Sequence, residues 1–291
     1  MKASRLLLVL LLWPVFLAAQ SPVPDVPSAR LVGLLPGEAS GTSSLFFLDG
    51  RLWTCNDHGT LRLRAVDTLK ASIDSVIDLG VSVYDLEEVT LDDRYIYFGD
   101  FGDNNGVRND LRILRLSLAN LRARRFRFDT IRFSYPDRST AMARNFDCEA
   151  FIAAGDSLYL FTKQWLSQGS VCYSLPAVPG THVARRRFAL PTEGLVTAAC
   201  YLPAQRSLVL LGYSLVVKPF VYVLEGFDAP DFHLGCQRRI ALANIPGNQT
   251  EGLASLDGHR FFLTRESLDL RLLSFKAALL RLDLDGEPCL H

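Results

Sequence analysis

The sequence predicts an all-β protein built from repeated units. Short apolar runs rich in β-branched and aromatic residues recur along the chain between turn residues, as at 95–98 and 208–211. No long stretch shows a 3.6-residue hydrophobic period, so helices are expected to be few. One order of strands and turns recurs five times, and this self-similarity points to a repeat architecture.

Each repeat begins with an apolar strand whose first residue is polar and is followed by a small or acidic one. The five starts are Ser40-Gly41, Glu87-Glu88, Glu149-Ala150, Thr197-Ala198 and Glu251-Gly252. A turn, commonly with aspartate, leads to a second strand that ends in polar residues. Third strands are expected at 61–66, 111–116, 171–175, 220–224 and 278–282, and fourth strands at 75–79, 126–133, 184–190 and 238–242.

Four-stranded units at this period are typical of β-propeller blades. We predict five blades, because a sixth would need extra strands hidden in the longer intervals. The fifth repeat has no fourth strand of its own, and residues 29–35 have the pattern to supply it. That pairing would close the ring and remove exposed sheet edges. A two-sheet sandwich is the alternative, but it does not explain the repeat.

The chain ends are expected to lie outside the propeller. Lys2 and Arg5 precede an apolar run over residues 6–19, which is too short to span about 30 Å of hydrocarbon as a helix. We predict a cleaved signal peptide, with an uncleaved anchor as the alternative. The mature chain is then secreted, in the periplasm or outside the cell, without a membrane span. The expected segments are a signal peptide over 1–19, a proline-rich linker over 20–29, one propeller domain over 30–285 and a tail over 286–291.

Composition excludes several classes of protein. The 291 residues carry 31 basic and 31 acidic side chains, which argues against nucleic acid as a partner. A hydrophobic content of 49% excludes a disordered chain. Six cysteines without a CxxC spacing argue against zinc and leave both disulfides and buried thiols open. Disulfide pairing and oligomeric state are not predicted.

Three strings resemble a known family: YDLEEVTLDDRYIYFGDFGDNNGVRNDLRILRL, NFDCEAFIAAGDSLYLFTKQW and QTEGLASLDGHRFFLTRES. They are similar to secreted bacterial propeller proteins that are common in Bacteroidetes and often carry a C-terminal sorting domain. The resemblance covers most of residues 30–284 and rests on the DxEE, DCEAF and QTEG motifs. It implies a propeller fold and export, but no established activity. Leu86 stands where the family usually has an aromatic residue, and the sequence ends at His291 without a sorting domain.

Blade topology also predicts where a site lies. In a propeller the first strand of each blade lines the central channel, and the loop between the second and third strands emerges at the mouth where that strand begins. Two groups of side chains should therefore converge at one mouth. The inner ring is Ser40, Glu87, Glu149, Thr197 and Glu251. The ligand rim is Asn56, Asp57, Asp100, Asp103, Asn104, Lys163, Tyr213, Arg265 and Glu266.

Three carboxylates that point into a narrow channel repel one another, so either their pKa values rise or a cation lies among them. Oxygen ligands favour Ca²⁺ over zinc or copper, and Glu87, Glu149 and Glu251 are the candidate ligands. The carboxylates could equally be held by backbone amides, by Arg265 or by ordered water. Residues 100–106 have the composition of a calcium loop, but they lack the EF-hand spacing and are typical of a tight turn.

The predicted function is binding of a small molecule or glycan at an acidic, cation-containing mouth, with hydrolysis left open. If the protein is a glycosidase, the acid and the base or nucleophile would come from Glu87, Glu149 and Glu251. Glycoside hydrolysis needs two such carboxyl groups roughly 5–9.5 Å apart. If the protein is a lactonase or phosphoesterase, a bound Ca²⁺ would polarise the substrate. Lys163 and Arg265 would then suit an anionic group of that substrate. The alternative is a non-enzymatic scaffold for protein–protein interaction, in which the channel carboxylates are purely structural.

Overall fold

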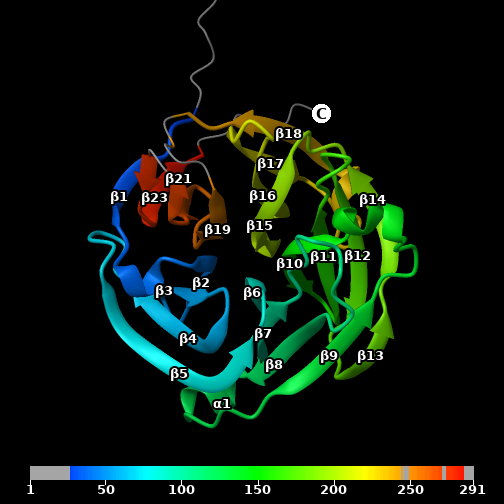
Figure 1. The fold of residues 1–291 in the computed structure, drawn as a ribbon, viewed down its shortest axis with the longest axis horizontal. Helices are drawn as coiled ribbons and strands as arrows, with labels where there is room; N and C mark the ends of the chain where they lie inside the picture. Colours follow the sequence, from blue (N-terminus) through cyan, green and yellow to red (C-terminus); the bar gives the residue numbers. More distant parts are fainter. Residues whose placement is uncertain (1–26, 244, 246–248, 271–272, 285–291) are drawn as a thin grey trace, which may run out of the picture.

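Five antiparallel sheets stand around a central axis in the computed structural model, which confirms the predicted five-bladed β-propeller (Figure 1). The structure describes residues 27–243, 245, 249–270 and 273–284. The predicted signal peptide, most of the linker and the C-terminal tail lie outside the described residues.

The strands of each blade follow one another outward from the axis. The first blade holds β2 (Thr42–Leu48), β3 (Arg51–Asn56), β4 (Gly59–Val66) and β5 (Ile73–Val83). The second holds β6 (Leu86–Leu91), β7 (Tyr95–Asp100), β8 (Arg112–Ser117) and β9 (Asp129–Ser134). The third holds β10 (Asp147–Ala154), β11 (Ser157–Lys163), β12 (Ser170–Pro176) and β14 (Arg185–Leu190). The fourth holds β15 (Leu195–Leu202), β16 (Ser207–Tyr213), β17 (Pro219–Glu225) and β18 (Cys236–Ala241).

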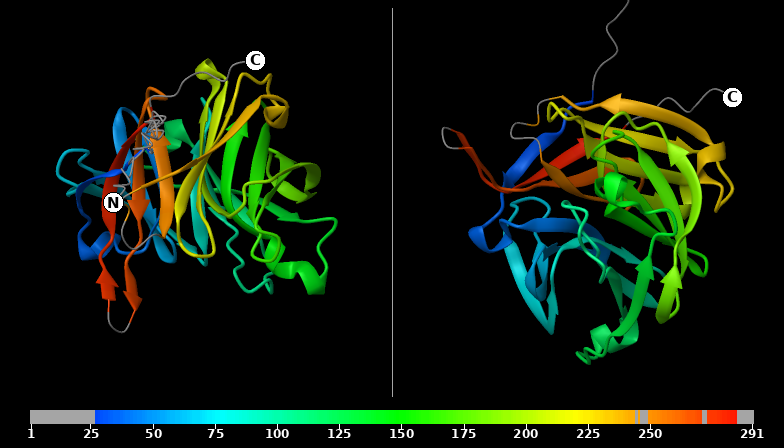
Figure 2. Two further views of the ribbon diagram at one scale, coloured as in Figure 1. Left: turned by 90° about the horizontal axis from the view of Figure 1, so that it is seen from above. Right: turned by 45° about the vertical axis from the view of Figure 1, so that its right-hand side comes forward.

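The two chain ends close the ring in the fifth blade, as the sequence predicts. This blade holds β19 (Thr250–Ser255), β20 (Arg260–Arg265), β23 (Ala278–Asp283) and, outermost, β1 (Arg30–Leu34). β1 pairs antiparallel with β23, with Leu31 opposite Leu280. Figure 1 shows the blue first strand beside the red last one. The short hairpin of β21 (Leu268–Leu270) and β22 (Leu273–Phe275) projects from this blade in Figure 2.

The core is divided into five apolar clusters, one between each pair of neighbouring blades. Side chains alternate along a strand, so consecutive residues of an inner strand enter opposite interfaces. Phe151 packs toward the second blade, whereas the next residue, Ile152, packs toward the fourth. Both faces of these strands are buried, which is why the sequence shows continuous apolar runs there.

The longest interval between repeats contains local structure rather than a sixth blade. Between β6 and β10 the chain forms the short helix α1 (Leu118–Arg122) and a 3₁₀ turn over Thr140–Asn145. One further strand, β13 (Gly180–Val183), leaves the third blade and pairs in parallel with β9 of the second. Its four residues show no strand pattern, and this strand was not predicted from the sequence.

Within the described part, no helix is long and apolar enough to cross a membrane.

The cysteines divide into two groups. Cys55, Cys148, Cys172 and Cys200 are free thiols buried in the blades, as expected of small apolar side chains inside strands. Cys236, at the start of β18, is disulfide-bonded.

Candidate functional site

A β-bulge near the start of every inner strand provides the ring of side chains at one channel mouth. In all five blades the pairing of first and second strands skips one residue. A bulge of this kind re-aims the side chain of the extra residue. The skipped residues are Ser43, Glu87, Glu149, Thr197 and Glu251.

The prediction for the first blade was three residues off. Ser40 follows the 3₁₀ turn over Gly37–Ala39, and its carbonyl accepts a hydrogen bond from the Ser267 amide. The ring position is Ser43. The Ser40-Gly41 pair resembles the polar–small starts of the other repeats but belongs to the turn before β2, so sequence alone placed the strand too early.

Three of the bulge carboxylates meet in one cavity of about 140 Å³. Its wall is made by the starts of the inner strands and by loops after the second strands. The lining residues are Ser43, Asp57, Asp85, Glu87, Asn104, Glu149, Lys163, Trp165, Tyr213, Gln249, Glu251 and Glu266. Thr197 is not among them, because its hydroxyl donates to the Thr250 carbonyl at 2.6 Å. We call this space the acidic cavity.

Lys163 supplies the positive charge in the acidic cavity. Its Nζ lies 2.7 Å from Glu149 Oε1, and its side chain is only 4% exposed. The ammonium also lies 4.8 Å from the ring centre of Trp165 and 5.4 Å from that of Tyr213. Burial alone would lower the pKa of Lys163, but the carboxylates, led by Glu149, raise it well above its usual value. The ammonium therefore stays charged.

Glu149 is the carboxylate that balances this charge. Burial raises the pKa of Glu149, while the contact with Lys163 opposes that shift. A charged lysine at 2.7 Å needs an ionised partner, so we take the pair as ionised. The same lysine leaves the other carboxyl groups of the cavity without a cation of their own.

Glu251, Glu266 and Glu87 have raised pKa values, so each is at least partly protonated at neutral pH. Burial raises the pKa of Glu251 to about 7. Burial, together with the charges of Glu251 and Asp57, raises the pKa of Glu266 to about 8. Neither side chain has a hydrogen bond or ion pair with another described residue. Burial, then the charges of Glu149 and Asp85, likewise raise the pKa of Glu87 well above its usual range.

Asp147 and Trp165 support the cavity from behind. Asp147 is fully buried; its carboxylate accepts hydrogen bonds from Trp165 Nε1 at 2.9 Å and from the Asp103 amide at 2.7 Å. These bonds fix the indole beside Lys163. The loop at Gly102 lies against the carboxyl groups of Glu87 and Asp85, where a Cβ atom would overlap with both. A side chain at this position would have to displace the two carboxyl groups.

Part of the predicted rim lines the cavity and part does not. Asp57, Asn104, Lys163, Tyr213 and Glu266 line it. The other four hold local structure. Asp100 pairs with Arg108 and Arg112, and Asp103 pairs with Arg138. Asn56 Oδ1 accepts from the Arg62 amide, and Arg265 donates to the Lys276 carbonyl.

Four residues of the cavity lining were not predicted from the sequence: Ser43, Asp85, Trp165 and Gln249. Asp147, which lies behind the wall, was not predicted either. The two aspartates carry a usable signal, because each stands two residues before a ring glutamate in the DxEE and DCEAF motifs. Trp165 and Gln249 lie in loops, and their position follows from long-range packing rather than from a local pattern.

The structure shows no coordination site for the predicted calcium ion among the described residues. Among the described residues, no three aspartate, glutamate, histidine or cysteine side chains converge closely enough to hold a metal ion. In this arrangement the ammonium of Lys163 is the cation among the carboxylates. The described residues therefore form no preformed Ca²⁺ site, and calcium binding stays a prediction.

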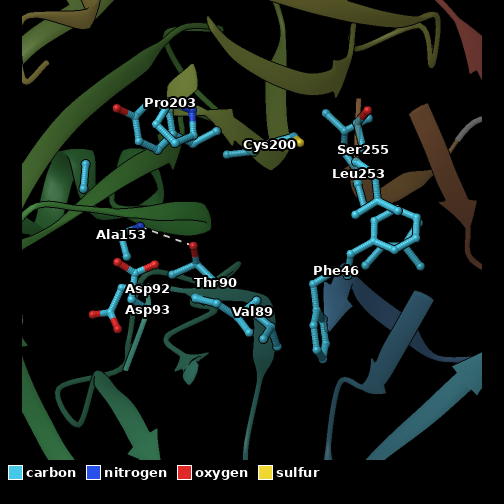
Figure 3. Close-up of a pocket in the computed structure, with 18 of the residues that line it drawn as sticks. Phe46, Val89, Thr90, Asp92, Asp93, Ala153, Cys200, Pro203, Leu253 and Ser255 are labelled. Carbon is cyan, nitrogen blue, oxygen red and sulfur yellow. Dashed lines mark hydrogen bonds between the residues drawn. The ribbon is translucent and has the colours of Figure 1, made fainter. Parts of the chain in front are cut away.

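A larger cavity of about 670 Å³ opens at the other end of the channel (Figure 3). Its lining includes Phe46, Val89, Cys200 and Leu253, and Thr90 accepts a hydrogen bond there from the Ala153 amide at 3.2 Å. Asp92, at its rim, is occupied by the turn amides of Arg94 and Tyr95. The chemically reactive groups lie in the smaller cavity, so we place the candidate site there despite its size.

No family model and no curated protein matches the sequence. Among solved structures, an α-L-arabinofuranosidase from Podospora anserina in complex with cellotriose aligns with a TM-score of 0.52 and 11% identity, over 92% of this chain and 100% of that one. A gluconolactonase from Xanthomonas campestris aligns with a TM-score of 0.48 and 11% identity, over 91% of this chain and 99% of that one. At these identities the likeness is one of fold alone.

Proposed function

We propose that this chain is an exported propeller that binds one small polyhydroxylated unit, such as the end of a glycan, in the acidic cavity and hydrolyses its glycosidic bond. The observation that carries the proposal is the contrast among the cavity carboxyl groups. Burial raises the pKa of Glu251 to about 7 and that of Glu266 to about 8, whereas Glu149 is ionised beside Lys163. Carboxyl groups whose environments separate their pKa values in this way serve as acid and base.

The chemistry follows from that contrast. Glycoside hydrolysis needs one protonated carboxyl to protonate the leaving oxygen and one carboxylate to activate water or attack the anomeric carbon. In our proposal one of these two groups, Glu251 or Glu266, gives its proton to the leaving oxygen as the C–O bond breaks. Glu149 accepts the proton of the attacking water. Trp165 and Tyr213 line the cavity and supply apolar ring surface beside these groups.

The size of the cavity limits the ligand. About 140 Å³ is small compared with the roughly 300–1,000 Å³ of pockets for drug-sized ligands. A single sugar unit or a chain end is therefore the expected occupant, and an internal segment of a polymer is not. The likeness in fold to an arabinofuranosidase is compatible with this proposal.

A purely structural role, as in a protein-interaction scaffold, accounts for other carboxylates. Glu88 accepts hydrogen bonds from the amides of Val89 and Ala199, and Asp100 and Asp147 are likewise bonded to backbone amides. Glu251 and Glu266 have no such partners among the described residues. The scaffold hypothesis leaves these two unexplained, because unpaired buried carboxyl groups cost stability.

The test is turnover of a panel of aryl glycosides by Glu149→Gln, Glu251→Gln and Glu266→Gln. We expect turnover to fall roughly 10²–10⁴-fold, the usual share of acid–base catalysis, with the thermal midpoint retained. Asp93→Asn is the matched control, since Asp93 is an exposed carboxylate that lines the opposite cavity. Equal turnover by all four variants would refute the proposal.

A bound calcium ion is the second candidate, favoured by the excess of carboxylates over the single lysine in the lining. Thermal unfolding after chelation, with and without millimolar Ca²⁺, separates the two. Ca²⁺ at 100 times its Kd would add roughly 2.7 kcal/mol to the free energy of unfolding. The arrangement with Lys163 as the internal cation predicts an unchanged midpoint.

A further inference from the structure

The acidic cavity holds more carboxyl groups than its one lysine can pair with. Six carboxyl groups line it: Asp57, Asp85, Glu87, Glu149, Glu251 and Glu266. Lys163 is the one lysine or arginine among the lining residues, and it is paired with Glu149. Asp147 adds a further carboxylate behind the wall, and the phenol of Tyr213 is neutral. His58, with Nδ1 at 2.6 Å from Asp57 Oδ1, is largely exposed at the rim.

Glu251 is a buried carboxyl group without a hydrogen-bond or ion-pair partner among the described residues, so a bound ligand could supply one. Its side chain sits at the bulge of β19, faces the cavity and is 8% exposed. It makes no hydrogen bond or ion pair with any described residue. A carboxyl group that is more than nine-tenths buried is stabilised when a donor reaches it, and a charged donor is worth about twice a neutral one.

The neighbours of Glu251 favour a cationic donor. A ligand cation favours the ionised form of the lining carboxyl groups and then pairs with it, in a setting where salt screens poorly, whereas a ligand anion disfavours that form. The same carboxyl groups would accept hydrogen bonds from sugar hydroxyls. A ligand that combines hydroxyl groups with one ammonium group matches both features.

We propose that the unit bound in the acidic cavity is an amino sugar whose protonated amine pairs with Glu251 and the neighbouring carboxyl groups. This inference rests on the proposed function and gives it a substrate class. An N-acetylated or neutral sugar of the same size would leave Glu251 without a charged partner. The amine pairs with Glu251 and sets specificity, which leaves Glu266 as the acid and Glu149 as the base that act on the glycosidic bond.

The test compares matched ligands by isothermal titration calorimetry at pH 7. Glucosamine, galactosamine and mannosamine are each paired with the N-acetylated and the neutral hexose of the same configuration. We expect at least one free amine to bind about tenfold or more tightly than both counterparts, which corresponds to about 1.4 kcal/mol. Amine binding should also release a proton from Glu251, seen as a heat that depends on the ionisation enthalpy of the buffer.

Variants locate the effect. Glu251→Gln should abolish the preference for the amine, and Asp93→Asn at the opposite cavity should leave it unchanged. If Glu251→Gln does not fold, as judged by circular dichroism, Glu251→Asp carries the same test, because the shorter side chain withdraws the carboxylate from the amine and should weaken the preference. Equal binding of amine and neutral sugars in every pair would overturn the inference.

Binding and turnover separate this inference from the proposed function. Hydrolysis of neutral glycosides without amine preference would leave the proposed function standing and overturn the inference. Amine-selective binding without turnover of any amino-sugar glycoside would support the inference and refute hydrolysis. Binding of Ca²⁺ that requires Glu251, with no preference among the sugars, would also overturn the inference.

Discussion

Two adjacent glutamates in β6 show how strongly position decides the role of a residue. Glu87 is the bulge residue and lines the acidic cavity. Glu88 points across the channel, where Oε1 accepts the Val89 amide at 2.9 Å and Oε2 accepts the Ala199 amide of β15 at 3.1 Å. Glu88 therefore links the second and fourth blades through the axis.

Glu88→Ala should destabilise the propeller without altering the acidic cavity. The change leaves the buried Ala199 amide without its acceptor, which costs about 1–3 kcal/mol. Urea unfolding gives the free energy directly, and Glu88→Gln, which keeps an acceptor oxygen, is the control. Equal stability of the alanine variant and the unchanged protein would show that water replaces the carboxylate.

The raised pKa values predict that stability falls as the pH rises from about 5 to above 8. Burial raises the pKa of Glu251 to about 7 and that of Glu266 to about 8, against an ordinary value of 4.5. The native state thus binds more protons than the unfolded state in this window, and its advantage is complete below pH 4.5 and lost through pH 7–8. Urea unfolding at several pH values measures the slope. Glu251→Gln should flatten it, and an unchanged slope in that variant would contradict the assignment.

At the scale of elements, the sequence predicts the blades well and the loops poorly. Every inner strand carries a local signal, since apolar residues on both faces follow a polar start. The first blade shows the limit, because Ser40-Gly41 imitates that start in a turn. Trp165 and Gln249 reach the site through loop conformations that depend on contacts remote in sequence, and β13 has no strand pattern of its own.

A side chain at Gly102, in the loop after β7, should displace the carboxyl groups of Glu87 and Asp85. A Cβ atom there would overlap with both side chains, so they must shift within a buried site, and overpacking of this kind typically costs about 1–3 kcal/mol. Gly102→Ala should therefore lower the thermal midpoint and weaken sugar binding together. Gly37→Ala is a matched control, since nothing lies within 4 Å of the added atom. Normal binding by Gly102→Ala would mean that the loop is not part of the site.

At the scale of the whole molecule, ring closure depends on one short strand. β1 covers the edge of β23 and buries Ala29 in the interface between the fourth and fifth blades. The sequence predicted this closure because the fifth repeat lacks a fourth strand. It could not predict which side chains meet at the channel mouth in detail, since that depends on the rotation of all five blades about the axis.

Removal of residues 1–34 should open the ring. The edge of β23 would then be unpaired, and exposed edges promote association between chains. We expect a lower thermal midpoint and larger species in size-exclusion chromatography. A synthetic peptide of residues 29–35, added in excess, should restore both. A shortened chain that stays monomeric and equally stable would show that the closure is dispensable.

The parallel pairing of β13 with β9 distributes mechanical strength unevenly around the ring. β13, which lies between two strands of the third blade in sequence, pairs with β9 at the outer edge of the second blade. These two blades therefore cannot separate without breaking the hydrogen bonds of a sheet. The seam at β1 and β23 joins strands from the two ends of the chain. Force applied to both ends of the chain would therefore separate β1 from β23 first. The second and third blades, which carry Glu87 and Glu149, would unfold last.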